Sequence, residues 1–175
     1  NIQMGQNNIS ARDIIIYLTA NDLEKIFKYY GEDKYSKMIS KKIVKDRKYK
    51  EIHTEDLVHI INSVKKNYEK KNKSTKVFQA LRILVNNEIS ELIIGLSKAC
   101  NIISKNGTIA VVAFHSIEDR ICKFFFNEIS SLRKVSLYLH INNTGDVSFN
   151  LIKKKPIIPT KKEIDENPPS RSAKL

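Results

Sequence analysis

The stretch GTIAVVAFHSIEDR (residues 107–120) is an apolar run that ends abruptly in a cluster of polar side chains. Residues 109–114 are rich in β-branched side chains and lack both charge and alternation, which predicts a strand covered on both faces, as in parallel sheets. Ser116, with Glu118 and Asp119 in the following turn, predicts a helix start. Ligands of open α/β sheets bind where such strands end. The stretch therefore predicts an α/β fold with functional residues at this polar corner.

Composition places the chain among globular proteins. Its 175 residues are 41% apolar and 29% charged, which fits one domain, or one domain with an insertion. No apolar run approaches the roughly 18 residues of a membrane helix, and the amino terminus lacks the pattern of a secretory signal, so we expect a cytoplasmic protein. Cys100 and Cys122 are isolated in apolar segments, which predicts buried free thiols. The histidines lack metal-ligand spacing, so no metal is expected.

The net charge of +12 predicts a nucleic-acid partner. Lysine enrichment also fits an AT-rich genome, because Lys, Asn and Ile are all frequent. The stretch from Lys34 to Lys50 contains eight basic residues and one acidic residue, and the stretch from Lys65 to Lys76 contains six lysines and one glutamate. This clustering favours a functional surface. On the first cluster we predict RNA contact by Lys41, Lys42 and Lys45. The alternative is a merely solvated face.

The chain divides into a helical part and an α/β part. Residues 1–8 form a leader, and residues 9–72 a helical subdomain with helix starts at Ser10 (with Asp13), Asn21 (with Glu24), Glu32 and Thr54. Residues 73–153 carry further helices, the strand and an antiparallel hairpin. The hairpin is expected at 135–141 and 147–152, and an extended basic tail at 154–175.

Four strings identify the family that the chain resembles. These are YGEDKYSKMISKKIV (30–44), FQALRILVNNEISEL (78–92), FHSIEDR (114–120) and KKPIIPTKKEIDENPPSRSAKL (154–175). They resemble, in order, blocks of the RsmH (MraW) family, bacterial S-adenosylmethionine-dependent enzymes that methylate N(4) of a cytidine in small-subunit ribosomal RNA. The resemblance implies a Rossmann-like methyltransferase with an all-helical substrate-recognition domain inserted, where residues 9–72 fall.

The resemblance also implies that the methyl-donor site lies mainly before residue 1. The family's glycine-rich loop is not found here, and residues 1–4 (Asn-Ile-Gln-Met) resemble the family motif Asp-Met-Arg-Met with both charges replaced. We therefore expect an incomplete Rossmann-like sheet and no cofactor-binding residue in this segment. The implied partners are small-subunit ribosomal RNA and a missing amino-terminal half, and a homo-oligomer stays open. The alternative function is a catalytically inactive basic RNA-binding fragment.

Two residues of the corner are the predicted catalytic residues. The amine of cytosine is a poor nucleophile, so an enzyme must hold the base out of its stack and align it with the methyl donor. His115 either contacts the base or RNA, or bonds to backbone and shapes the corner. Ser116 is either a ligand or a helix cap. Arg120 either contacts RNA or pairs with a neighbouring acid.

Two further pairs are predicted to bind RNA. Arg82 and Asn86, with Gln79 and Glu88 nearby, either line the substrate cleft or lock their helix in place by buried hydrogen bonds. Arg171 and Lys174 resemble a family tail near the active cleft, where they contact phosphate or remain solvated.

Overall fold

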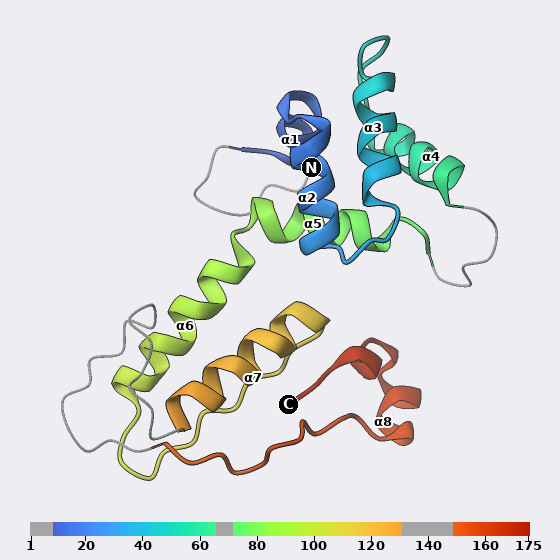
Figure 1. Ribbon diagram of the computed structural model, residues 1–175. Coiled ribbons are helices and arrows are strands. Elements are labelled where there is room, and N and C mark those ends of the chain that lie inside the picture. Colours follow the sequence, from blue (N-terminus) through green and yellow to red (C-terminus); the bar gives the residue numbers. More distant parts are fainter. Residues whose placement is uncertain (1–8, 66–71, 131–148) are drawn as a thin grey trace. The chain divides into compact units, whose positions relative to one another are not determined.

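The computed structural model describes residues 9–65, 72–130 and 149–175 of the chain. The chain divides into two compact units, residues 1–88 and residues 89–175 (Figure 1). The helices of the described residues are α1 (Ala11–Tyr17), α2 (Ala20–Tyr29), α3 (Ser36–Asp46), α4 (Thr54–Val64), α5 (Thr75–Val85), α6 (Glu88–Ile102), α7 (Ser116–Ser130), α8 (Lys161–Glu166) and the 3₁₀ helix η1 (Pro168–Ser172).

The first two helices begin at side-chain caps. At α1, the Asp13 amide donates to the Ser10 hydroxyl at 3.2 Å and the Ser10 amide donates to the Asp13 carboxylate at 2.8 Å, which confirms the predicted capping box. At α2 the cap is Thr19, whose hydroxyl accepts from the Asp22 amide at 3.2 Å. The prediction of a cap at Asn21 was therefore wrong by two residues.

A single core holds the first unit together. Leu23 and Phe27 of α2 and Ile39 and Ile43 of α3 are fully buried in it, and each such side chain contributes about 1.5–3 kcal/mol by leaving water. The same core includes α4 and α5, the latter through Val77, Ala80, Leu81 and Val85. The first compact unit, residues 1–88, includes α5, which supplies one wall of its core.

Helix α3 turns a polar face outward. Ser36 and Ser40 are buried beside Ile39 and Ile43, so small side chains bring this helix close to its neighbours. Met38 is 56% exposed. The face that remains in water carries lysines.

Gly31 sits where two helices approach closely. A Cβ atom at this position would lie 2.6 Å from the carbonyl oxygen of Lys76 and 2.7 Å from that of Phe27, both of them backbone atoms. The second residue after α2 must therefore lack a side chain for the start of α5 to pack here.

In the second unit, α6 and α7 lie side by side (Figure 1) and share a small core. Leu96 and Cys100 of α6 pack with Cys122 and Phe125 of α7. Both cysteines are buried free thiols, as predicted, and burial raises the pKa of each thiol. They serve as small apolar side chains in this core.

The predicted α/β fold, an incomplete Rossmann-like sheet, was wrong for the residues that the structure describes. They form helices and no named strand, and their β pairing is one isolated bridge between Ala113 and Lys174. A strand needs a neighbour for its backbone groups, and residues 108–114 find only this short partner in the described ranges. Residues 135–141 and most of 147–152, the predicted hairpin, lie outside the described residues.

The extended run is also covered on one face only. Ala113 is buried and Ile109 and Val111 pack against the core of the second unit, whereas Val112 and Phe114 are 52% and 56% exposed. This alternation is the period of a strand with one open face, so the prediction of two covered faces was wrong.

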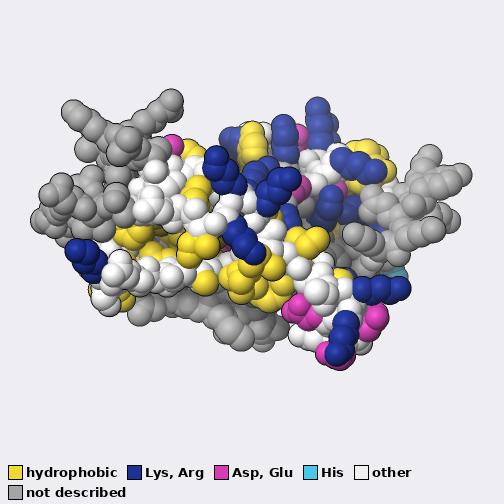
Figure 2. Space-filling model, turned by 90° about the horizontal axis from the view of Figure 1, so that it is seen from below, with side chains coloured by type: hydrophobic (Ala, Val, Ile, Leu, Met, Phe, Trp, Pro, Cys, Tyr) yellow, Lys and Arg dark blue, Asp and Glu magenta, His cyan; other side chains and the backbone are white. Residues whose placement is uncertain are grey.

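The surface combines basic and apolar side chains. Figure 2 shows Lys and Arg side chains projecting from one face, with exposed apolar side chains beside them. None of the described helices has both the length and the apolar character of a membrane span.

The close approach at Gly31 predicts a contrast between two Gly-to-Ala substitutions. Gly31→Ala should lower the free energy of unfolding by about 1–3 kcal/mol, because the new methyl group meets backbone that cannot swing away. Gly95→Ala should leave it unchanged or raise it by up to about 1 kcal/mol, since Gly95 is inside α6 with nothing within 4 Å of the added atom. Urea unfolding followed by circular dichroism measures both. Equal effects would contradict this account of Gly31.

Candidate functional site

The polar corner before α7 is held by reciprocal hydrogen bonds. The Glu118 amide donates to Nδ1 of His115 at 3.3 Å, while the Glu118 carboxylate accepts from the amides of His115 at 3.2 Å and Phe114 at 2.8 Å. This is a capping box with histidine in the place usually taken by serine or threonine. His115 thus bonds to backbone, and its ring is fixed by the helix it starts. Its contact with a base or RNA stays a prediction.

The same bonds determine what His115 can offer chemically. Because Nδ1 accepts a hydrogen bond, a neutral ring carries its proton on Nε2, which lies 3.2 Å from Oε1 of Glu118. The ring then carries an N–H donor rather than a basic lone pair at Nε2, and that donor lies beside the Glu118 carboxylate. Ser116 is the exposed first residue of α7.

Asp119 joins the start of α7 to the carboxyl-terminal tail. Its carboxylate accepts from Nζ of Lys123, one turn along α7, and from Nζ of Lys174, each at 2.8 Å. Burial alone would raise the pKa of the Asp119 carboxyl, but the two ammonium groups outweigh it and hold the pKa below its ordinary value. Backbone bonds of 2.8 Å in both directions between Ala113 and Lys174 fix the tail beside the corner.

The predicted residues of the second unit are therefore partly brought together. His115 directly precedes α7, and Ser116 and Arg120 lie in the first turns of this helix. Lys174 forms an ion pair with Asp119, the residue before Arg120. Lys174 is thus engaged in an ion pair that its prediction as a phosphate ligand did not foresee. Arg171 is exposed in η1.

Arg82 and Asn86 converge on one carboxylate in the first unit. The Arg82 guanidinium bonds to both oxygens of Glu88, at 2.7 and 3.2 Å, and the Asn86 amide adds a third bond at 3.2 Å. Gln79 donates to the carbonyl oxygen of Tyr30 at 3.3 Å. These bonds join the end of α5 to the start of α6, and the Arg82 side chain is 50% exposed, so the bonds are not the buried ones that the locking alternative supposed. The RNA-binding role of Arg82 and Asn86 stays a prediction.

The lysine clusters differ in how far they are free for a polyanion. On α3, Lys41 and Lys45 are exposed, and Lys42 lies 3.6 Å from Asp46. In the second cluster, Lys65 is buried against Asp33, Lys73 donates to the Lys65 carbonyl at 3.1 Å, and Lys76 donates to the Glu32 carbonyl at 3.0 Å. The described part of the second cluster thus holds the fold together, and the α3 face is the exposed basic surface.

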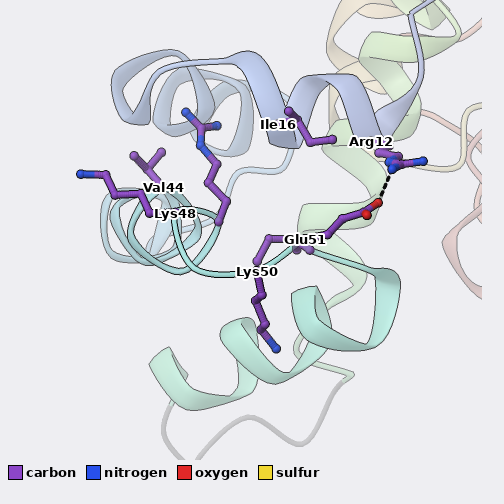
Figure 3. A pocket seen from close by; sticks show the side chains of 8 residues that line it. Arg12, Ile16, Val44, Lys48, Lys50 and Glu51 are labelled. Carbon is purple, nitrogen blue, oxygen red and sulfur yellow. Dashed lines mark ion pairs between the residues drawn. The ribbon is translucent and has the colours of Figure 1, made fainter.

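A hollow beside α1 was not predictable from the sequence. Its wall comes from α1, from the end of α3 and from the connection before α4, and Arg12 forms an ion pair with Glu51 across it (Figure 3). These elements are distant in sequence, so only the folded chain shows that their basic residues meet.

The ion pairs of Asp119 predict acid-sensitive docking of the tail. A carboxyl whose pKa is lowered by folding stabilises the folded form above its ordinary pKa of about 3.9, and that contribution is lost as the pH falls through the lowered value. Lys174→Met should speed hydrogen exchange at the amide of residue 174, measured by NMR, and should remove its acid-dependent step. Lys123→Met is the control, because Lys123 lies on α7 itself. Equal exchange rates in both variants would refute the role of the Lys174 ion pair in docking the tail.

Comparison with known proteins places this chain in a family. The model of the MraW methylase family matches residues 2–175. Among curated relatives, ribosomal RNA small subunit methyltransferase H of Sulfurihydrogenibium sp. is 42% identical over 171 residues, which cover 95% of this chain and 54% of the relative. The proteins of the same name from Persephonella marina and Streptococcus mutans are 41% and 38% identical, covering 95% and 99% of this chain and 53% and 57% of the relatives.

Two facts follow from the extent of these matches. The chain spans about half the length of the curated relatives it matches. The family match covers nearly every residue of the chain, which confirms the resemblance carried by the four sequence strings. The chain belongs to the MraW methylase family.

Proposed function

We propose that this chain is part of an S-adenosylmethionine-dependent enzyme that methylates N(4) of a cytidine in small-subunit ribosomal RNA, and that it acts in the cytoplasm. Family membership and the printed name of the relatives support this proposal. The single structural observation that carries it is the exposed lysine face of α3, since phosphate contacts provide most of the affinity for RNA.

The two parts of the chain have different proposed roles. Residues 9–72 hold the RNA through Lys41, Lys42 and Lys45, and the corner at His115 and Ser116 receives the cytosine. Held in this way, the weakly nucleophilic amine would gain the orientation that its transfer reaction needs. Arg120, Arg171 and, if it leaves Asp119, Lys174 are the proposed phosphate contacts near the corner.

The site for S-adenosylmethionine is proposed to lie mainly outside residues 1–175. A nucleoside pocket of this kind needs glycines that open a helix beside the ligand. In the described ranges Gly31 follows α2, Gly95 is inside α6, and a Cβ at Gly107 would meet the Ile103 side chain at 2.5 Å. These residues do not fit the cofactor, so the proposed partner for catalysis is the remainder of the full-length protein.

The α3 face can be tested by charge reversal. Lys41→Glu, Lys42→Glu and Lys45→Glu together should weaken RNA binding, and the slope of log affinity against log salt should fall by about 2, because fewer counterions are released. Fluorescence anisotropy with a labelled fragment of small-subunit ribosomal RNA, repeated over a range of salt concentrations, measures both quantities.

The matched control changes the same charge elsewhere. Lys153→Glu, Lys154→Glu and Lys155→Glu alter three exposed lysines of the tail, so a general effect of net charge would appear equally in both triple variants. An unchanged salt slope in the α3 variant would remove this face from the proposal.

A second experiment tests the division of labour for the cofactor. Isothermal titration of the 175-residue chain with S-adenosylmethionine should give no measurable binding, because the described glycines provide no pocket for it. Tight binding would refute the proposed location of the donor site. RNA binding by the same preparation is the control that the chain is folded.

A further inference from the structure

The extended run before α7 turns apolar side chains toward water on one side. Its alternate residues Ala110, Val112 and Phe114 are exposed, while Val111 packs against the core of the second unit and Ala113 is buried. Successive side chains of an extended chain point to opposite faces. The core formed by α6 and α7 therefore covers one face of the run, and the exposed side chains lie on the other.

The carboxyl-terminal tail widens this exposed side. Ala113 and Lys174 exchange two backbone hydrogen bonds of 2.8 Å, and Leu175 and Ile157 exchange two more, of 2.7 and 3.0 Å. Reciprocal bonds of this kind join antiparallel partners, and directly opposite residues have their side chains on the same face. Val112 is therefore opposite Leu175, and Leu175 is opposite Ile157. These three side chains form one row across three segments, each between 47% and 52% exposed.

The chemistry of this surface matches a polypeptide rather than RNA. We call it the apolar face, and it consists of Ala110, Val112, Phe114, Ile157 and Leu175. None of these side chains carries a charge or a hydrogen-bonding group, which phosphate and base edges require. Apolar side chains gathered on an exposed surface gain free energy by leaving water, and such patches mark protein contacts.

Two observations identify the partner that fits the apolar face. The chain spans about half the length of its curated relatives, so each relative has a further part that this chain does not match. Phe114 directly precedes His115, so a partner that covers the apolar face also reaches the polar corner. The proposed function needs the methyl donor at that corner, held by polypeptide outside residues 1–175. A second copy of this chain would bring no donor site there.

We propose that the apolar face is the docking surface for the remaining part of the full-length protein, which covers it with apolar side chains of its own. The inference rests on the proposed function, in which that part holds S-adenosylmethionine, and it names the surface through which this part docks. Docking here brings the donor-binding part beside His115, where the cytosine is received.

The test is co-expression of the 175-residue chain, carrying an amino-terminal affinity tag, with the unmatched part of the relative from Sulfurihydrogenibium sp.. The unmodified chain should retain this part on the affinity resin. The face variant, Val112→Gln with Leu175→Gln, should lower the retained amount about 10-fold, because two neighbouring side chains of the row no longer gain by leaving water.

The matched control is Ile102→Gln with Phe124→Gln. These apolar side chains are exposed on α6 and α7, the helices on the opposite side of the run, so retention should stay unchanged. Hydrogen exchange of the unmodified chain needs no substitution. The amides of residues 110–114 should exchange more slowly when the second polypeptide is bound, whereas those of α8, which lies outside the apolar face, should not change.

Four outcomes would overturn the inference. Two of them are equal retention by the unmodified chain and the face variant, and no retention by the unmodified chain. A dimer in sedimentation that the face variant dissociates would assign the apolar face to a second copy, and weaker RNA binding by the face variant alone would assign it to RNA. RNA binding through the α3 face is measured on the same preparations, so the proposed function is decided separately.

Discussion

The first unit depends on a charge pair that water does not reach. Lys65 and Asp33 have side chains that are 2% and 1% exposed, and Nζ of Lys65 lies 2.6 Å from the carboxylate. The same ammonium donates to the Lys73 carbonyl, and the other carboxylate oxygen accepts from the Tyr35 amide at 2.9 Å. Removing one partner of such a pair leaves a buried charge uncompensated and costs about 3–5 kcal/mol. The pair therefore fixes the end of α4, the approach to α5 and the turn before α3 as one arrangement.

This arrangement determines which lysines remain exposed to water. Helix α3 begins directly after the Asp33 turn, where the Ser36 amide donates to the Asp33 carbonyl at 3.1 Å. Its buried side, with Ile39 and Ile43, is thereby committed to the core, and its lysines must face water. The net charge of +12 includes lysines that are not available to a ligand, because side chains such as Lys65 are engaged in bonds inside the fold. Position relative to the buried pair, rather than abundance, separates structural lysines from candidate phosphate ligands.

Local signals were predictable from the sequence, and long-range pairing was not. Ser10 and Asp13 form the expected capping box because all its atoms lie within four residues. Asn21 has a similar pattern, yet Thr19 caps α2, because the packing of the helix decides which of the neighbouring polar residues is the cap. The apolar run before the corner had the composition of a buried strand, but its partners decide whether a sheet forms, and Lys174 lies 55 residues from the Asp119 it binds. The location of the corner was therefore foreseeable, and the contacts that clamp it were not.

The corner gains its rigidity from two unrelated sources. From within α7, Glu118 holds the amides that precede the helix and orients His115. From outside, the tail pairs its backbone with Ala113 and with Ile157, where Leu175 accepts at 2.7 Å and donates at 3.0 Å. A binding group must be held to within a fraction of an ångström, and one turn of capped helix is open to fraying. Because the tail crosses beside Ala113, fraying of α7 would also have to break the Asp119 pair with Lys174. The carboxyl-terminal segment is thus part of the candidate site through the order it imposes, even where its own side chains do not reach a substrate.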